Sequence, residues 1–373
     1  MRKRCRVTIN DQVFSAFRGD VLIDVALSNG IDIPFDCRSG HCGICRVRVL
    51  DGLAIGGECR EPGTVRACQT RIMSDLQLKV EALPEVRTVT GQVRAVARHA
   101  LDVVEVKIEP SRPIVYLPGQ YLKVKFRGYP VRCYNPTVSM EDITERELLH
   151  FQVRRFRGGQ VSAAIGEAIR EGHHVEVLGP FGSAFLRPAS QSRLVLVASD
   201  TGFAPVWSMA VAALEEHPRR RVVAVVGARA LESFYMINAL CALARYPNVT
   251  IVPVVETPQN VTAAIRVGSV PDQIPKLSAE DSVHVCGPQQ LVEAVRGIAA
   301  AADALCYCVP FVPQDTGRPA NENVLSRARD WFNSAKQHPV ASEGGRRAAS
   351  PRRSQVRETV ATSSRSPRFR SSG

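Results

Sequence analysis

The sequence has no apolar stretch long enough to cross a membrane. A spanning helix needs about eighteen or more consecutive apolar residues, and no run among the 373 residues approaches that length. The basic first segment, residues 1–5, continues into polar, alternating sequence and lacks the apolar core of a secretion signal. We therefore expect a cytoplasmic protein. Disulfides are rare in that compartment, so the eleven cysteines are predicted to be metal ligands and buried thiols.

The sequence also lacks a basic charge spread over its length, although its net charge is +12. Residues 340–373 contain eight Arg and two Glu, so 8 − 2 = +6 comes from this segment alone. The remaining +6 over 339 residues is ordinary for a globular protein. We do not expect a nucleic-acid partner, because a basic tail of this kind is usually only solvated. Residues 314–373 are predicted to be a basic, mostly disordered tail.

Three cysteines lie close together in one glycine-rich segment. Cys37, Cys42 and Cys45 have the spacing C-x4-C-x2-C, which is the plant-type spacing of ligands to a 2Fe–2S cluster. Gly40 and Gly43 permit the left-handed turns that direct backbone N–H groups toward a single point. A zinc site would instead pair two close-set couples of Cys or His. The spacing therefore favours an iron–sulfur cluster over zinc or over unligated thiols.

A fourth thiolate has to come from another part of the chain. The candidates are Cys68, in the segment Ala67-Cys68-Gln69-Thr70, and Cys59. Residues 1–84 combine a hairpin pattern near 7–16, a short helix after Asp20 and alternating strands later on. This stretch resembles a β-grasp, plant-type ferredoxin domain, and the Ala-Cys-Gln-Thr context implies that Cys68 is the fourth ligand. Only 22 residues separate Cys45 from Cys68, fewer than is usual in that family.

Residues 88–190 have the short alternating runs and turn residues of a small antiparallel barrel. The segment Arg132-Cys133-Tyr134-Asn135 resembles the flavin motif of the ferredoxin-reductase superfamily. A second segment, Arg157-Gly158-Gly159-Gln160-Val161-Ser162, precedes a predicted helix over 163–170, and its free N–H groups suit a pyrophosphate. The turn at 179–182 also matches the end of the flavin domain in that superfamily. Together these motifs predict a flavin-binding barrel.

Residues 191–313 alternate strand and helix, which predicts an α/β doubly wound domain that binds its ligand at the carboxyl ends of its strands. Strands are expected at 194–197, 222–226, 249–255 and 283–286, and helices at 204–216, 232–245 and 288–301. The loop at 198–205 resembles a glycine-rich nicotinamide loop. The segment Cys286-Gly287-Pro288 matches the Cys-Gly-Pro of the same superfamily. These features predict an NAD(P)H-binding domain.

Ferredoxin, flavin barrel and nicotinamide domain occur in an order that resembles the reductases of Rieske-type ring-hydroxylating oxygenases. The resemblance implies electron transfer from NAD(P)H through FAD and a 2Fe–2S cluster to a separate ferredoxin or a Rieske-type terminal oxygenase. The implied cluster ligands are Cys37, Cys42, Cys45 and Cys68. The implied flavin-binding residues are Arg132, Tyr134, Asn135, Gly159, Gln160, Val161, Ser162 and Phe311. The implied nicotinamide-binding residues are Thr201, Gly202, Arg229, Gly287 and Pro288, and the implied catalytic thiol is Cys286.

Two residues depart from the family pattern. Asp200 stands where the family has glycine, and Val309 stands where it has an acid. Like charges about 4 Å apart repel by about 4 kcal/mol at an effective dielectric constant of 20, so Asp200 is expected to weaken binding of a pyrophosphate. The alternative hypothesis is a catalytically impaired member that acts as an interaction or nucleic-acid-associated protein through its basic tail.

Overall fold

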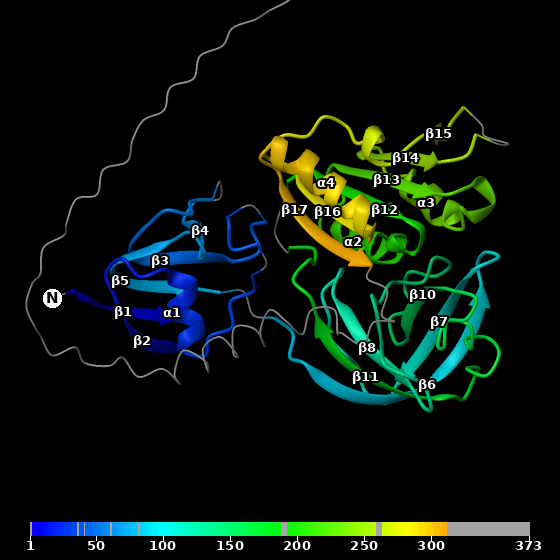
Figure 1. Cartoon of the computed structure of the whole chain (residues 1–373), viewed down its shortest axis with the longest axis horizontal. Helices are drawn as coiled ribbons and strands as arrows, with labels where there is room; N and C mark the ends of the chain where they lie inside the picture. Colours follow the sequence, from blue (N-terminus) through cyan, green and yellow to red (C-terminus); the bar gives the residue numbers. More distant parts are fainter. Residues whose placement is uncertain are drawn as a thin grey trace, which may run out of the picture. The chain divides into compact units, whose positions relative to one another are not determined.

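Three sheets, each built from one continuous stretch of the chain, make up the fold (Figure 1). The computed structural model describes residues 2–35, 37–40, 42–59, 62–80, 83–187, 192–258 and 263–311. All of these belong to one compact unit. The predicted tail, residues 314–373, lies outside the described residues.

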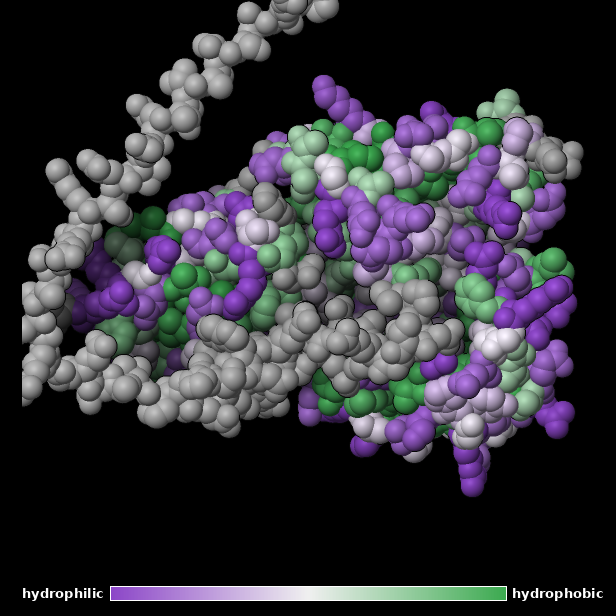
Figure 2. Space-filling model, viewed as in Figure 1, coloured by the Kyte–Doolittle hydropathy of each residue, from purple (hydrophilic) through white to green (hydrophobic). Residues whose placement is uncertain are grey.

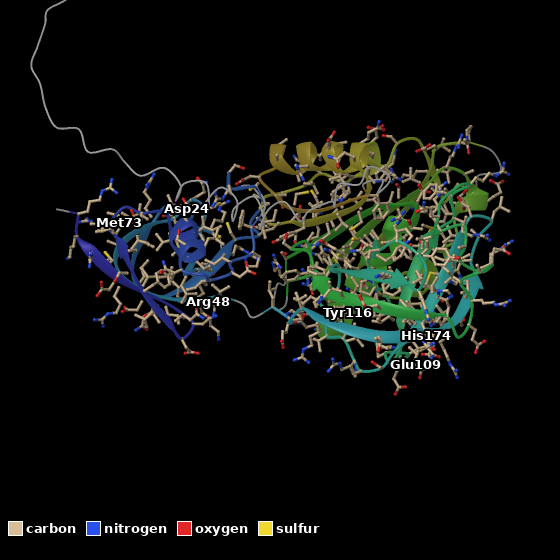
Figure 3. All side chains as sticks on the ribbon, turned by 60° about the horizontal axis from the view of Figure 1, so that its bottom comes forward. Asp24, Arg48, Met73, Glu109, Tyr116 and His174 are labelled. Carbon is tan, nitrogen blue, oxygen red and sulfur yellow. The ribbon has the colours of Figure 1, made fainter. Side chains whose placement is uncertain are left out.

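The first sheet has the order β2-β1-β5-β3-β4, with β1 and β5 parallel and the other pairs antiparallel. Cys5, Val7 and Ile9 alternate with more exposed residues along β1, so one face of the strand is buried. Buried side chains of α1 belong to the same hydrophobic core. The elements are β1 (Arg4–Ile9), β2 (Gln12–Phe17), α1 (Leu22–Ser28), β3 (Arg46–Ile55), β4 (Thr64–Arg66) and β5 (Arg71–Lys79). In Figure 3, Asp24, Arg48 and Met73 mark α1, β3 and β5.

The second sheet is the barrel predicted to bind a flavin, with the order β10-β7-β6-β11-β8-β9 and antiparallel pairing throughout. Inward-facing Val, Ile, Leu and Phe side chains fill its core. The strands are β6 (Arg87–Arg98), β7 (Val103–Pro110), β8 (Tyr121–Phe126), β9 (Arg132–Tyr134), β10 (Leu149–Arg154) and β11 (His174–Phe181).

The helix predicted over residues 163–170 is not present, so that prediction was wrong. One helical turn forms through the bond from the Ile165 N–H to the Val161 carbonyl, at 3.2 Å. Gly166 then takes a φ of +86° and donates to the Ile169 carbonyl, which ends the turn. The four-residue spacing of Val161, Ile165 and Ile169 suggested a helix, but these three residues are buried in the barrel core as an irregular cap.

A buried polar cluster lies in the barrel beside this core. The Glu105 carboxylate is 2% exposed, and its Oε1 lies 3.2 Å from His150 Nδ1. Its other oxygen lies 3.5 Å from His99 Nε2. Burial alone would raise the pKa of Glu105, but the two histidines outweigh burial and lower it to about 2. The folded protein therefore holds this carboxylate in its ionised form.

Glu105→Gln is expected to lower the free energy of unfolding by about 2 kcal/mol near pH 6, because a buried charged hydrogen bond is lost. The folded pKa is depressed, so the contribution of Glu105 is fully present above its unfolded value near 4.5 and is lost as pH falls toward 2. Urea melts from pH 6 to pH 3 should show the variant converging on the wild type.

The matched control is Glu109→Gln, an exposed residue on the same strand that is labelled in Figure 3. This substitution should change stability by less than about 0.5 kcal/mol at every pH. If Glu105→Gln matched it, the cluster would contribute nothing to stability.

The third sheet is parallel, with the order β15-β14-β13-β12-β16-β17. Its strands are β12 (Leu194–Ser199), β13 (Val222–Ala228), β14 (Val249–Val255), β15 (Arg266–Val267), β16 (Ser282–Pro288) and β17 (Leu305–Phe311). The helices are α2 (Phe203–Glu216), α3 (Ile237–Leu243) and α4 (Gln289–Ala301), with 3-10 turns η1 (Asp200–Gly202), η2 (Leu231–Ser233) and η3 (Pro271–Gln273). The helix predicted over 232–245 is shorter than expected, because η2 precedes it.

Buried residues of α2 and α3 share one core with β12 and β13, while those of α4 share a second core with β12 and β16. The sheet is therefore covered on both faces, as the doubly wound prediction requires. No helix among the described residues is long and apolar enough to cross a membrane. Figure 2 shows polar and apolar residues intermixed over the face in view.

Candidate functional site

The four candidate cluster thiols form two pairs. The Cys42 N–H donates to Cys37 Sγ at 3.3 Å, and the Cys45 and Cys68 side chains lie close enough to influence each other's protonation. A 2Fe–2S cluster with four thiolate ligands needs this arrangement, because each of its two irons takes two of them. The grouping of the donors into two pairs therefore fits a two-iron cluster.

The two thiol pairs differ in their surroundings. Burial raises the pKa of Cys42 to about 11 and that of Cys45 to about 12. Burial would also raise the pKa of Cys37, but hydrogen bonds from Ser39 and Cys42 outweigh it and lower that pKa to about 6. Metal binding requires thiolates, so loading this site releases the protons that Cys42 and Cys45 hold.

Cys68 is tied to the cluster loop by the residues that flank it. Arg66 Nη1 donates to the Gly40 carbonyl at 2.7 Å, and Gln69 Nε2 donates to the Arg38 carbonyl at 2.8 Å. The Cys59 thiol lies instead 3.8 Å from the Gly57 carbonyl oxygen. This geometry favours Cys68 over Cys59 as the fourth ligand.

The loop that carries Cys37, Cys42 and Cys45 packs against β17 through a small group of apolar side chains. An added Cβ at Gly43 would come within 2.6 Å of Leu305 Cδ2, so the loop backbone lies directly against that side chain. The residues of this apolar cluster are Cys37, Cys42, Ile44, Ala184, Leu305, Tyr307 and Val309. β17 leads from this contact to Phe311, which pairs with Pro288 at the end of β16. One strand therefore connects the thiol loop to the Cys-Gly-Pro segment.

The residues of the predicted flavin motif lie on and just after β9. The Tyr134 ring centroid is 6.0 Å from that of Phe151, and burial raises the pKa of Tyr134. Asn135 Nδ2 donates to the carbonyls of Gly119 and Gln120, both at 3.1 Å. Arg132 Nη1 donates to the Val131 carbonyl at 3.0 Å.

The segment 157–162 forms a tight turn that suits a phosphate. An added Cβ at Gly159 would meet Ser162 Oγ at 2.4 Å and the Phe156 carbonyl oxygen at 3.2 Å, so a side chain there would displace the Ser162 hydroxyl. No described residue accepts a hydrogen bond from the backbone N–H groups of Gln160, Val161 or Ser162. Three consecutive N–H groups that have no partner among the described residues are a donor set that suits a pyrophosphate. These residues fit FAD, although their N–H groups lie at the start of a single helical turn and not at the start of the predicted helix.

The third site lies where the order of the parallel strands reverses. β12 pairs with both β13 and β16, so the loops after β12 and β16 meet at the switch point. An added Cβ at Gly202 would come within 2.1 Å of the Cys286 carbonyl oxygen. The Thr201-Gly202 loop and the Cys286-Gly287-Pro288 segment are thus in backbone contact. Cys286 is fully buried, and burial raises the pKa of its thiol.

A cavity of about 200 Å³ opens beside this switch point, at the carboxyl ends of β12, β13 and β14. Arg229, which the sequence predicted to bind the nicotinamide cofactor, lines this cavity, and so do Arg154 and Glu256, which the sequence did not single out. Its full lining is Arg154, Ser199, Asp200, Gly227, Ala228, Arg229, Val254, Glu256, Gly268 and Val270. The cavity therefore holds charges of both signs.

From the sequence, Asp200 was expected to face a pyrophosphate as an uncompensated negative charge. In the structure its charge is paired. Its Oδ2 accepts a hydrogen bond from Arg154 Nη1 at 2.9 Å. Burial raises the pKa of Asp200, and the Arg154 charge acts in the opposite direction. The repulsion expected from Asp200 alone is therefore partly offset.

Comparison with known proteins agrees with this three-part site. Family models match a 2Fe-2S iron-sulfur cluster binding domain over residues 7–73, an oxidoreductase FAD-binding domain over 93–185 and an oxidoreductase NAD-binding domain over 196–297. The chain is 30% identical over 302 residues to the ferredoxin–NAD(P)+ reductase component of the naphthalene 1,2-dioxygenase system of Pseudomonas putida, covering 77% of this chain and 90% of that relative. It belongs to the reductase components of ring-hydroxylating dioxygenase systems.

A second relative and a solved structure extend the comparison. This reductase is 33% identical over 303 residues to the reductase component of the naphthalene 1,2-dioxygenase/salicylate 5-hydroxylase systems of a Ralstonia species, again covering 77% and 90% of the two chains. Its fold matches the crystal structure of an Amycolatopsis cytochrome P450 reductase with a TM-score of 0.58, 26% identity and coverage of 83% and 99%. The reductase is an NAD(P)H-dependent oxidoreductase that uses FAD and a 2Fe–2S cluster.

Proposed function

We propose that this reductase takes a hydride from NADH and delivers single electrons to a separate ferredoxin or a Rieske-type terminal oxygenase that acts on an aromatic ring. Bound FAD would supply the step from two-electron to one-electron chemistry, which no side chain can perform. The paired thiols beside β17 are the observation that carries the proposal. They support a cluster at Cys37, Cys42, Cys45 and Cys68, next to the strand that passes Cys286 and ends beside Pro288.

On the flavin and nicotinamide side, the chain's own contribution is positioning. Gly202 allows its loop to contact the Cys286 carbonyl, which brings the ends of β12 and β16 together. The buried Cys286 side chain stays a neutral thiol, so it adds no charge where a hydride leaves the nicotinamide. Phe311 beside Pro288 places an aromatic ring at the same edge. Tyr134, Asn135 and the turn at 159–162 would hold the FAD.

We further propose that the reductase prefers NADH to NADPH. Glu256 and Arg229 line the same cavity, so a 2′-phosphate placed there would meet a carboxylate as well as the guanidinium. The kcat/KM ratio of NADH to NADPH is expected to exceed about tenfold, or about 1.4 kcal/mol. Glu256→Gln should reduce that ratio toward one.

The matched control for this preference is Glu232→Gln. Glu232 is an exposed carboxylate in η2 and does not line the cavity. Its removal should leave the ratio unchanged. A wild-type preference for NADPH, or a ratio that responds to Glu232 and not to Glu256, would overturn this assignment.

We place the reductase in the cytoplasm, where NAD(P)H is available and thiols stay reduced. All eleven cysteines are unbridged, which supports a reducing compartment. The partner class rests on the multicomponent systems of the relatives, and its aromatic substrate is set by the oxygenase.

The visible spectrum of the purified protein tests the proposed function. We expect flavin and iron–sulfur absorbance in a brown sample, and anaerobic bleaching of both on addition of NADH. Subsequent electron transfer to a Rieske-type oxygenase or a ferredoxin should restore the oxidised spectrum. A colourless protein, or one whose spectrum ignores NADH and NADPH, would instead favour an interaction protein that retains only the fold.

A further inference from the structure

Asp200 has an unusual backbone conformation for a residue with a side chain. Its φ is +50°, in the left-handed region that glycine adopts freely and that Asp and Asn tolerate best among the other residues. Aspartate in place of the family's glycine therefore keeps the turn after β12 and adds a carboxylate to it. That carboxylate lines the cavity at the carboxyl edge of the sheet.

Arg154 joins the barrel to this loop. It is the last residue of β10, and its Nε donates to Asp102 Oδ2 at 2.8 Å while its Nη1 donates to Asp200 Oδ2 at 2.9 Å. Asp102 lies in the turn before β7. One guanidinium is therefore shared between two carboxylates, and the three side chains together carry one net negative charge.

The position of this triad matters because a dinucleotide lies along the same edge. In a doubly wound domain the phosphates meet the loop after the first strand, which here is residues 199–202. Arg154 and Asp200 both line the cavity at that loop. Arg154 is a planar bidentate donor suited to a phosphate, but Asp200 already accepts from it.

We propose that Asp200 and Arg154 form a latch on the nicotinamide nucleotide site, in which the pyrophosphate of the incoming cofactor replaces the Asp200 carboxylate as the acceptor of Arg154. Arg154 is then the phosphate-binding cation of this chain. Asp200 is a positioning residue that holds Arg154 in place before binding and competes with the cofactor for it. This inference rests on the proposed use of NADH.

The latch differs from simple repulsion in how the two residues depend on each other. If Asp200 only repelled the phosphates, its neutralisation would help equally with or without Arg154. If Asp200 competes for Arg154, its neutralisation helps only while Arg154 is present. A double-mutant cycle separates these two cases.

The experiment measures the affinity of the FAD- and cluster-loaded protein for ADP-ribose, which has the pyrophosphate but no nicotinamide. Asp200→Asn, which suits the left-handed backbone, is expected to tighten binding about tenfold, or about 1.4 kcal/mol. Arg154→Gln is expected to weaken it about tenfold. In the Arg154→Gln background, Asp200→Asn should change affinity by less than about twofold. The gain from Asp200→Asn should appear in the KM for NADH and not in kcat.

Asp303→Asn is the matched control, because Asp303 is also an aspartate at positive φ, +53°, and does not line the cavity. It should leave the affinity for ADP-ribose unchanged. Unchanged or weaker binding by Asp200→Asn, or an equal gain in both backgrounds, would overturn the latch. A wild type that binds no ADP-ribose supports the latch if Asp200→Asn restores binding, and contradicts it otherwise. Bleaching of the wild type by NADH tests the proposed function separately.

Discussion

Cys68→Ser is expected to abolish the iron–sulfur spectrum of this reductase, whereas Cys59→Ser leaves it intact. The Cys68 side chain lies close to that of Cys45, and its neighbours Arg66 and Gln69 donate hydrogen bonds to the cluster loop. A serine hydroxyl in place of that thiol leaves one iron with a single thiolate from the chain. Iron and acid-labile sulfide per chain, with the visible spectrum, give the measurement.

Flavin content provides the internal control for both variants. Neither cysteine lies in the barrel, so FAD occupancy should match the wild type in each case. Loss of the cluster from Cys59→Ser, with retention in Cys68→Ser, would assign the fourth ligand to Cys59. Loss in both would indicate that the segment before β4 has to rearrange around the cluster.

Gly202→Ala is expected to reduce kcat/KM for NADH by more than about 100-fold, or about 2.7 kcal/mol. The new Cβ would lie 2.1 Å from the Cys286 carbonyl oxygen and 2.7 Å from its carbonyl carbon. Because these are backbone atoms, no change of rotamer relieves the overlap, and the ends of β12 and β16 have to separate. Steady-state reduction of a dye by NADH measures the loss.

Gly297→Ala is the matched substitution, since Gly297 lies in α4 and its new methyl group would have no atom within 4 Å apart from the neighbouring backbone of its own helix. It should keep full activity and raise stability by about 0.5–1 kcal/mol, as Gly to Ala does within helices. FAD and cluster content should be normal in both variants. If Gly202→Ala kept wild-type kcat/KM, the contact between the two nicotinamide segments would not matter for hydride transfer.

The sequence predicted those parts of the site that depend on local chemistry. The thiol spacing of the cluster loop, the turn at 157–162 and the loop after β12 each lie within a few consecutive residues. Each is also bounded by a strand whose alternation or apolar run is visible in the sequence. For the same reason the three sheets, in their order, agree with the predicted fold class.

Contacts between distant segments could not be predicted in this way. Arg154 meets Asp102 and Asp200 across 52 and 46 residues, and no local pattern marks such a partner. Asp200 therefore looked like an isolated charge in the sequence, and Glu256 like an ordinary strand-end residue. The spacing of Val161, Ile165 and Ile169 fitted a helix, because packing into the barrel core, and not periodicity, decides the backbone there.

The first sheet is complete at Lys79, and all four candidate ligands precede that residue. A further 232 residues, 311 − 79, separate Lys79 from the end of β17. At a synthesis rate of about 5–20 residues per second, the ribosome needs roughly 10–50 s to make them. The ferredoxin unit can therefore fold, and its thiols can receive iron and sulfide, before the flavin barrel and the nucleotide domain exist. Cluster assembly on nascent chains would then be independent of FAD supply, and the contact with Leu305 would be among the last to form.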